Sequence, residues 1–242
     1  QAALVTDPDY FEARLALAHV RASQNRLEDA QTEYGRALKE EPASVEALRG
    51  LRAVLARKGD WSGAKAATER ILGGAGESVE EWNQLGSLEA RLGNPTKAEA
   101  ALARALKLEP RSAETYNNLG ILRHRAGDYA RALEAFRDAS RVNPGLKETY
   151  ANMATAALRA RDIPAAEEAV ARALELKPDW AFAVAMQGAV LYAQGRKEDA
   201  LASWEKALEM EPGQPQAAEW LIKANGEQGE SATQRRGATE TR

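Results

Sequence analysis

Residues 113–146 read AETYNNLGILRHRAGDYARALEAFRDASRVNPGL, and this stretch decides the fold because it contains two helix patterns and the signals that end them. In its first half, Tyr116 and Leu119 recur at the spacing that places apolar side chains on one face of a helix. Gly127 and Asp128 then interrupt the pattern. Glycine supplies the left-handed residue that closes a helix, and aspartate supplies a capping side chain for the next one.

The second half of the stretch predicts another helix, which follows the break directly. Ala132, Leu133, Phe136 and Ala139 fall on one face of this helix and are expected to be buried. The helix is expected to stop before Pro144, because proline cannot donate its backbone nitrogen and restricts the residue before it. The stretch therefore predicts a helix, a tight turn, a second helix and a stop.

The same arrangement recurs along the chain with a fixed step of 34 residues. Prolines follow this step, with one vacancy at Gly76: Pro8, Pro42, Pro110, Pro144, Pro178 and Pro212. A column of alanines follows it without a gap: Ala30, Ala64, Ala98, Ala132, Ala166 and Ala200. A second small-residue column follows it as well: Ala37, Ile71, Ala105, Ala139, Ala173 and Ala207. A constant period over more than 200 residues indicates stacked helical repeats.

These columns resemble the tetratricopeptide repeat (TPR) family, whose unit carries W-x2-L-G-x2-Y, then A-x3-F, A and P. The unit 79–112 matches at Trp82, Leu85, Gly86, Ala98, Leu102, Ala105 and Pro110. The resemblance implies an all-α, right-handed superhelical α-solenoid of antiparallel helix pairs. It predicts six full repeats followed by a capping helix: 11–44, 45–78, 79–112, 113–146, 147–180, 181–214 and the cap 215–224. We expect residues 1–10 to end a preceding repeat and 225–242 to be a disordered tail, since the tail lacks periodicity and large apolar residues.

The unit 45–78 departs from the repeat pattern at three places. Arg52 stands at a small-residue position and Thr68 at a large apolar one. Glycines between Gly73 and Gly76 lower helix propensity at the end of the unit. They are compatible either with a soft point in the array or with a fixed loop.

Composition gives no support to catalysis or metal binding. Cysteine is absent, and the two histidines, His19 and His124, are three repeats apart, so we expect no metal site and no cofactor. The many glutamates are spread along helix surfaces, which indicates solvated faces rather than acid/base pairs. We therefore expect a protein that is not an enzyme and has no catalytic residues.

Charge and hydropathy limit the partners. The net charge is only -3 with 29% charged residues, which disfavours binding to nucleic acid. The longest uncharged run, Ala181 to Gly195, is too short to cross a bilayer, so no membrane insertion is expected. We expect a soluble protein, cytoplasmic or periplasmic. The compartment stays open, because a targeting segment could be missing from a chain that opens without methionine.

The family resemblance implies that a partner binds in the concave groove lined by the first helix of each repeat. At the sixth position of the repeats this groove would present Gln84, Asn118 and Asn152. An amide donates and accepts hydrogen bonds, so a row of amides can hold the backbone of an extended peptide. This run is similar to the asparagine ladder of O-linked N-acetylglucosamine transferases. The alternative is that these are ordinary exposed polar residues.

Position 13 of the repeats forms a basic column that consists of Arg57, Arg91, Arg125 and Arg159. Such a column would suit acidic residues of a partner. A cation in the last helical turn also complements the helix dipole, by about 0.3–1 kcal/mol each, and we expect this to be the main cause. His124, at position 12, has no histidine counterpart in other repeats and is expected to be a side chain that faces the groove.

Two further groups complete the expected groove. Asn117 and Asn118 match part of the family's carboxylate clamp for chaperone tails, but the lysines of that clamp are absent, which disfavours a chaperone co-factor. The last repeat presents Phe182, Met186 and Tyr192 at groove positions. These residues are expected either to lie under the capping helix or to form an apolar anchor for a partner or for the chain's own tail.

The function that best fits these features is a non-catalytic scaffold that binds an extended segment of a protein partner. Two alternatives remain open: the substrate-adaptor region of a larger enzyme such as a glycosyltransferase, and a bacterial envelope or pilus assembly factor. The composition is compatible with a bacterial source. Self-association through the N-terminal half-repeat is also expected, because its packing face would be uncapped.

Overall fold

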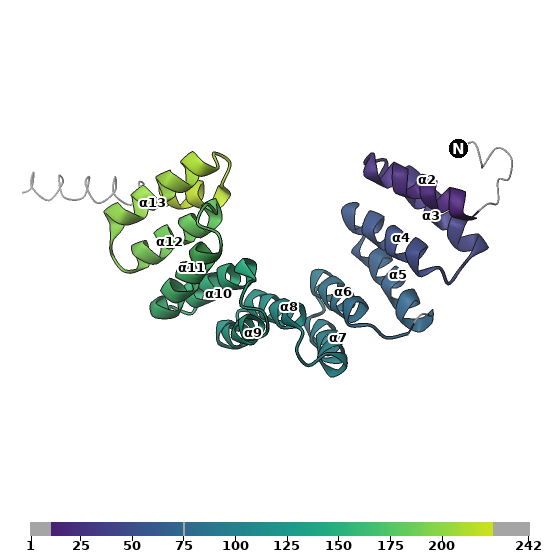
Figure 1. The fold of residues 1–242 in the computed structure, drawn as a ribbon, viewed down its shortest axis with the longest axis horizontal. Coiled ribbons are helices and arrows are strands. Elements are labelled where there is room, and N and C mark those ends of the chain that lie inside the picture. The colour runs from purple at the N-terminus through teal and green to yellow at the C-terminus, as the bar shows by residue number, and fades with distance from the viewer. Residues whose placement is uncertain (1–10, 75, 225–242) are drawn as a thin grey trace, which may run out of the picture. The chain divides into compact units, whose positions relative to one another are not determined.

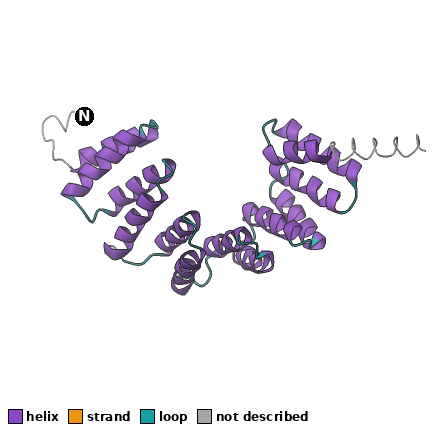
Figure 2. Cartoon of the chain, turned by 180° about the vertical axis from the view of Figure 1, so that it is seen from behind, coloured by secondary structure: helices purple, strands orange, loops and turns teal. Residues whose placement is uncertain are grey.

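A computed structural model describes residues 11–74 and 76–224, and all regular structure in these two ranges is helical (Figure 2). The first helices of the repeats are α2 (Phe11–Ser23), α4 (Val45–Arg57), α6 (Val79–Arg91), α8 (Ala113–Arg125), α10 (Lys147–Arg159) and α12 (Ala181–Ala193). The second helices are α3 (Leu27–Glu40), α5 (Trp61–Gly74), α7 (Pro95–Leu108), α9 (Tyr129–Val142), α11 (Ile163–Leu176) and α13 (Lys197–Met210). Residues 215–224 form a further helical segment. The stretches 1–10 and 225–242, predicted as a repeat end and a disordered tail, lie outside the described residues.

Each helix begins 34 residues after its counterpart in the preceding repeat; the first helices, for example, begin at residues 11, 45, 79, 113, 147 and 181. The chain divides into two compact units, residues 1–122 and 123–242. Consecutive helices pack side by side from α2 to α7 and from α9 to α13, as α2 does with α3 and α12 with α13 (Figure 1). The prediction of an all-α array of helix pairs is confirmed.

The turn inside every repeat is closed by a residue with a left-handed backbone. These residues are Asn25 (φ 61°), Gly59 (79°), Gly93 (79°), Gly127 (80°), Arg161 (59°) and Gly195 (82°). The next backbone N–H then donates to a carbonyl five residues back, as Asp128 N does to Arg123 O at 3.0 Å. Asp128 also caps α9, as predicted, by accepting from Arg131 N at 3.2 Å. Arg161 holds the same conformation at a cost of about 1–2 kcal/mol, because its Cβ crowds the backbone.

Small residues allow the paired helices to approach closely. The predicted alanine columns are buried: every member from Ala30 to Ala200 is fully buried, and the column from Ala37 to Ala207 is at most 2% exposed. A Cβ atom added at Gly86 would lie 2.8 Å from Leu102 Cγ, and one added at Gly188 would lie 2.4 Å from Trp204 Nε1. Glycine is therefore required at these two helical positions, despite its low helix propensity.

The unusual residues of the repeat 45–78 have a structural explanation. Arg52 forms an ion pair with Glu81, which is 1% exposed, and Arg49 Nε donates to the same carboxylate at 2.8 Å. In another repeat, the small Gly86 of the first helix packs against the large Leu102 of the second helix. At the equivalent positions of this repeat the sizes are exchanged: the large residue, Arg52, is on the first helix, and the smaller one, Thr68, is on the second. The end of the repeat contains two glycines within α5 and Gly76 with a φ of 91°.

Three glutamates contradict the expectation that these side chains lie on solvated faces. Glu33, Glu81 and Glu89 are at most 4% exposed. Burying a carboxylate is costly unless it is paired, and each of the three has basic partners. Glu33 lies 3.1 Å from Arg21 and 3.0 Å from Arg36, and it also pairs with Arg14 at 3.6 Å. The prediction failed because all of these partners except Arg36 lie on neighbouring helices and are distant in sequence.

The Glu89 carboxylate shows what this pairing does to ionisation. It accepts hydrogen bonds from Asn94 Nδ2 at 2.8 Å and pairs with Lys65 Nζ at 3.0 Å. Burial alone would raise the pKa of Glu89, but the hydrogen bonds from Lys65 and Asn94 outweigh it and hold the pKa below its ordinary value. Glu89 therefore remains ionised, and its role is to stabilise the contact of α6 with Lys65 of α5.

Candidate functional site

The amides predicted at the sixth repeat position lie on first helices. In the first unit, Gln84 on α6 and Asn118 on α8 are both half-buried, and so is Asn117 beside them. In the second unit, Asn152 on α10 is also half-buried. Each of these side chains has part of its surface accessible to a ligand.

The amide column stops on both sides for reasons of packing. At Gly50 on α4, an added Cβ would lie 2.3 Å from Tyr34 Cζ, so the tyrosine ring occupies the space that an amide would need. On α12, Met186 was expected to face the groove, but it is only 2% exposed, and its Sδ lies 3.9 Å from Thr155 Oγ1 on α10. Met186 therefore packs one repeat against the previous one and is not available to a partner.

The four arginines of the basic column lie in the last turns of their helices, as predicted, and all are exposed. Three of them contact the preceding repeat. Arg57 donates to Ala22 O at 2.7 Å and to Asn25 Oδ1 at 2.8 Å. These bonds satisfy groups at the end of α2.

The other two contacts are with aromatic rings. The Arg91 guanidinium lies 4.5 Å from the centroid of the Trp61 ring, and the Arg159 guanidinium lies 5.8 Å from that of Tyr129. Arg159 Nε also donates to the Tyr129 hydroxyl at 3.3 Å. Sequence reasoning missed these inter-repeat contacts. The available signal was an aromatic residue at the start of a second helix with an arginine 30 residues later.

His124 does not add a positive charge to the basic column. Its ring packs on Tyr129 with centroids 5.3 Å apart, and Nε2 is buried without a hydrogen-bond partner among the described residues. Burial lowers the pKa of His124, and the charges of Arg159 and Arg125 lower it further. The imidazole is therefore neutral near pH 7 and fills space beside the basic column.

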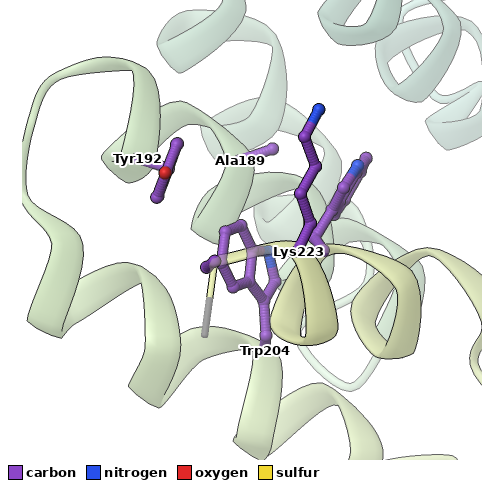
Figure 3. Close-up of a pocket in the computed structure, with 6 residues that line it drawn as sticks. Ala189, Tyr192, Trp204 and Lys223 are labelled. Atoms are coloured by element: carbon purple, nitrogen blue, oxygen red, sulfur yellow. The ribbon is translucent and has the colours of Figure 1, made fainter. Parts of the chain in front are cut away.

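A cavity of about 230 Å³ lies where the last repeat meets residues 215–224. Figure 3 shows Ala189, Tyr192, Trp204 and Lys223 around the same space. The complete lining is Ala189, Tyr192, Trp204, Trp220, Lys223 and Ala224. The Trp204 ring centroid lies 5.6 Å from that of Tyr192 and 6.1 Å from that of Trp220. This is an aromatic chamber with one basic side chain.

The chamber agrees only partly with the predicted apolar anchor. Tyr192 lines it, whereas Phe182 is half-buried and packs against Trp180 with centroids 5.6 Å apart. Trp204 and Lys223 were not among the predicted site residues. Trp204 occupies the repeat's large apolar position, where Tyr34 and Phe136 also stand, so its size was the one signal in the sequence.

The described residues contain no cluster of three or more His, Cys, Asp or Glu side chains that could hold a metal ion. Among the described helices, none combines the length and the apolar character needed to cross a membrane.

Comparison with known proteins identifies the repeats. Two family models, both described as tetratricopeptide repeat, match this chain: one over residues 83–145 and 185–235, and the other over residues 1–55 and 123–188. No curated protein sequence matches significantly.

Solved structures with the same fold are found at low identity. The chain is similar to the APC/C hetero-tetramer Cut9–Hcn1 (20% identity, TM-score 0.69, 91% of this chain), but it spans only 44% of that chain. It is similar to YrrB, a TPR protein with an unusual peptide-binding site (23%, TM-score 0.56, 76% of this chain and 94% of YrrB). It is also similar to PilF of Pseudomonas aeruginosa (18%, TM-score 0.68, 88% of this chain and 97% of PilF).

Proposed function

This chain belongs to the tetratricopeptide repeat family, and on that premise we propose that it is a non-catalytic scaffold that binds an extended segment of a partner protein on its first helices. The observation that carries the proposal is the half-buried amide at the same position of successive first helices. Gln84 and Asn118 provide it in the first unit, and Asn152 provides it in the second. Amides pair with the N–H and C=O groups of an extended chain whatever its sequence.

The exposed arginines add a preference for acidic partners. Arg57 and Arg91 in the first unit and Arg159 in the second are held in place by contacts with the preceding repeat, so each charge has a fixed position on its own first helix. Because these charges are exposed, they raise the association rate more than the final affinity. The steering is therefore expected to weaken as salt is added.

The comparisons support this class of function in general terms. YrrB is described as having a peptide-binding site, which agrees with a peptide-binding role for a chain of the same fold. The likeness to PilF, at 18% identity, concerns the fold alone. We therefore assign neither pilus assembly nor substrate delivery to a glycosyltransferase.

The double variant Asn118→Ala, Asn152→Ala tests the proposal. It removes two amides without harming helix propensity, since alanine is the best helix former. We expect a loss of about 2 kcal/mol, roughly a thirtyfold increase in Kd, for a partner first isolated by affinity capture and then titrated as a purified protein. The measurement is isothermal titration calorimetry.

The matched control is Gln187→Ala, which removes an exposed amide of α12 that lies outside the amide column. Its Kd should equal that of the unchanged protein. If the double variant binds as tightly as the control while circular dichroism shows an intact fold, the amides do not hold the partner.

A second candidate activity, self-association, is favoured by the exposed face of α2. Val20 is 51% exposed, and with Ala13, Ala16 and Leu17 it forms the apolar part of an open hollow that Arg21, Gln24 and Arg26 also line. In the next repeat, the equivalent residues Ala47 and Val54 are at most 1% exposed, and α4 packs against α3. On α2 this face lacks such a helix among the described residues. We propose that a helix of a second copy of this chain covers it.

Val20→Lys tests self-association by placing a charge in the centre of this face. A lysine near the C-terminal end of α2 complements the helix dipole, so the fold should tolerate it. We expect the unchanged protein to show a dimer that dissociates on dilution in sedimentation equilibrium and the variant to be monomeric. The control is Leu108→Lys, at an apolar side chain of similar exposure (44%) at the end of α7. If Val20→Lys dimerises as strongly as the parent protein, or if the parent protein forms no dimer, this interface is ruled out.

A further inference from the structure

The aromatic chamber between α12, α13 and residues 215–224 has the properties of a binding site for one side chain. We propose that it receives a bulky apolar side chain of the partner segment, and that an Asp or Glu next to that side chain pairs with Lys223. The inference rests on the proposed function, because the same partner segment would supply the apolar residue. It adds a sequence preference that amide contacts to backbone cannot provide.

The size of the chamber fits a side chain. Its volume of about 230 Å³ lies below the range of about 300–1,000 Å³ that is usual for small-molecule and cofactor sites. Aromatic walls favour an apolar or aromatic occupant, since ring pairs gain about 0.5–1.5 kcal/mol beyond the burial of area. A single large apolar side chain is therefore the occupant that matches both volume and lining.

The walls are held rigidly before any ligand binds. Trp204 is 2% exposed, its Nε1 donates to Ala185 O at 3.0 Å, and its ring lies against Gly188, where an added Cβ would be only 2.4 Å away. On the opposite side, Gln214 Oε1 accepts from Ala217 N at 2.6 Å and so caps the helical segment that carries Trp220. Because the rings are already fixed, little conformational entropy is lost when a side chain enters.

Two other repeat junctions fill the equivalent space with their own side chains. Between α10 and α12 the residue at this position is Met186, which is buried, and between α3 and α4 the Tyr34 ring occupies the space beside Gly50. At the last junction the equivalent residue is Trp220, and a cavity remains beside it. The open chamber therefore differs from these two junctions, where a side chain of the repeat fills the space.

Residues 225–242 offer no large apolar side chain to the chamber. Residues 225–242 read NGEQGESATQRRGATETR and contain no large apolar side chain. A partner's apolar side chain therefore suits the chamber better than any side chain of residues 225–242 does.

The charged groups around the chamber favour one kind of residue next to the apolar side chain in the partner segment. Lys223 is the one side chain in the lining that is charged at neutral pH, and Lys197 Nζ lies 5.6 Å from the ring centroid of Tyr192 at the same site. Two ammonium groups disfavour a cationic ligand, although aromatic rings alone would attract one. Glu219 on the same segment is exposed and is not part of the lining. An acidic residue beside the apolar one is therefore preferred.

Titration with short peptides tests this inference without the natural partner. The probes are acetyl-Phe-Asp-amide and two peptides matched to it, acetyl-Phe-Asn-amide and acetyl-Ala-Asp-amide. The readout is the indole N–H signals of Trp204 and Trp220 in ¹⁵N-edited NMR spectra. We expect the Phe-Asp peptide to shift these two signals with a Kd on the order of millimolar. The Phe-Asn peptide should bind roughly two- to fivefold more weakly, as an exposed ion pair allows, and the Ala-Asp peptide should cause no shift.

Two variants assign the contacts. Ala189→Met fills the chamber and should abolish binding of the Phe-Asp peptide, whereas Lys223→Gln should remove the preference for Phe-Asp over Phe-Asn. The control, Ile222→Ala, changes a neighbouring side chain that is 73% exposed and outside the lining, and it should bind like the parent. The indole signals of Trp61 and Trp82, in the first unit, should not move, which would show that the peptide binds locally, and circular dichroism checks that each variant remains folded.

Several results would overturn the inference: no shift with the Phe-Asp peptide, equal shifts with the Ala-Asp peptide, or binding that survives Ala189→Met. None of these results depends on the amides of the first helices. If the chamber binds no probe while the amide variant still weakens the natural partner, the scaffold function stands and the anchor site alone is wrong.

Discussion

Replacing Trp204 with alanine is expected to lower the free energy of unfolding by about 3–5 kcal/mol. The indole is 2% exposed, packs against Gly188 and Trp220, and donates a hydrogen bond to Ala185 O. Truncation removes the apolar burial and leaves a cavity.

Urea unfolding followed by far-ultraviolet circular dichroism measures this loss, and hydrogen exchange of the α12 and α13 amides localises it. The second readout is needed because repeat arrays can unfold in parts. Trp180→Ala is the control within the same unit, because Trp180 is only half-buried and packs on Phe182. Its cost should be clearly smaller. A loss below about 1.5 kcal/mol for Trp204→Ala would mean that this ring does not hold the last repeat to the segment 215–224.

Replacing Arg52 with alanine is expected to cost about 3 kcal/mol, although a surface arginine ordinarily costs far less. Glu81 is 1% exposed, so its carboxylate needs the two guanidinium groups of Arg52 and Arg49. Removing one partner leaves a buried charge that is only partly neutralised. The value lies at the lower end of the range for broken buried pairs, because Arg49 remains.

Two comparisons separate the ion pair from packing. The exposed pair Arg131–Asp128, broken by Arg131→Ala, should cost less than 1 kcal/mol. The double variant Arg52→Ala, Glu81→Leu should recover most of the lost stability, because an apolar residue of similar volume needs no cation. Chemical denaturation of the three variants measures both effects. If the double variant is less stable than Arg52→Ala, the carboxylate contributes through something other than the pair.

The sequence alone predicted the repeating parts of this protein. Helix starts, the buried alanine columns and the left-handed Gly127 follow from local properties: the spacing of apolar residues, the low bulk of alanine and the conformational freedom of glycine. These properties act within a few residues, so a 34-residue period carries them from one repeat to the next. The left-handed backbone of Asn25 and Arg161 was not predicted only because these residues replace glycine at the same position of the repeat.

The contacts that give this chain its individual character were decided by tertiary structure. The sequence did not show that Glu81 is buried between Arg49 and Arg52, or that Arg91 lies over Trp61. Each pair joins residues about 30 positions apart, and many other residues have that spacing without touching. Only the packed orientation of neighbouring helices selects which of them meet.

Some candidate site residues were likewise predicted by the sequence, and others were found only in the tertiary structure. The period alone placed Gln84, Asn118 and Asn152 at equivalent positions of first helices, because the first helices are equivalent. Whether a groove residue is available to a partner depends on how neighbouring side chains fill space, which a repeat pattern does not contain. Met186 is buried for this reason, and for the same reason Trp204, Trp220 and Lys223 enclose an open chamber.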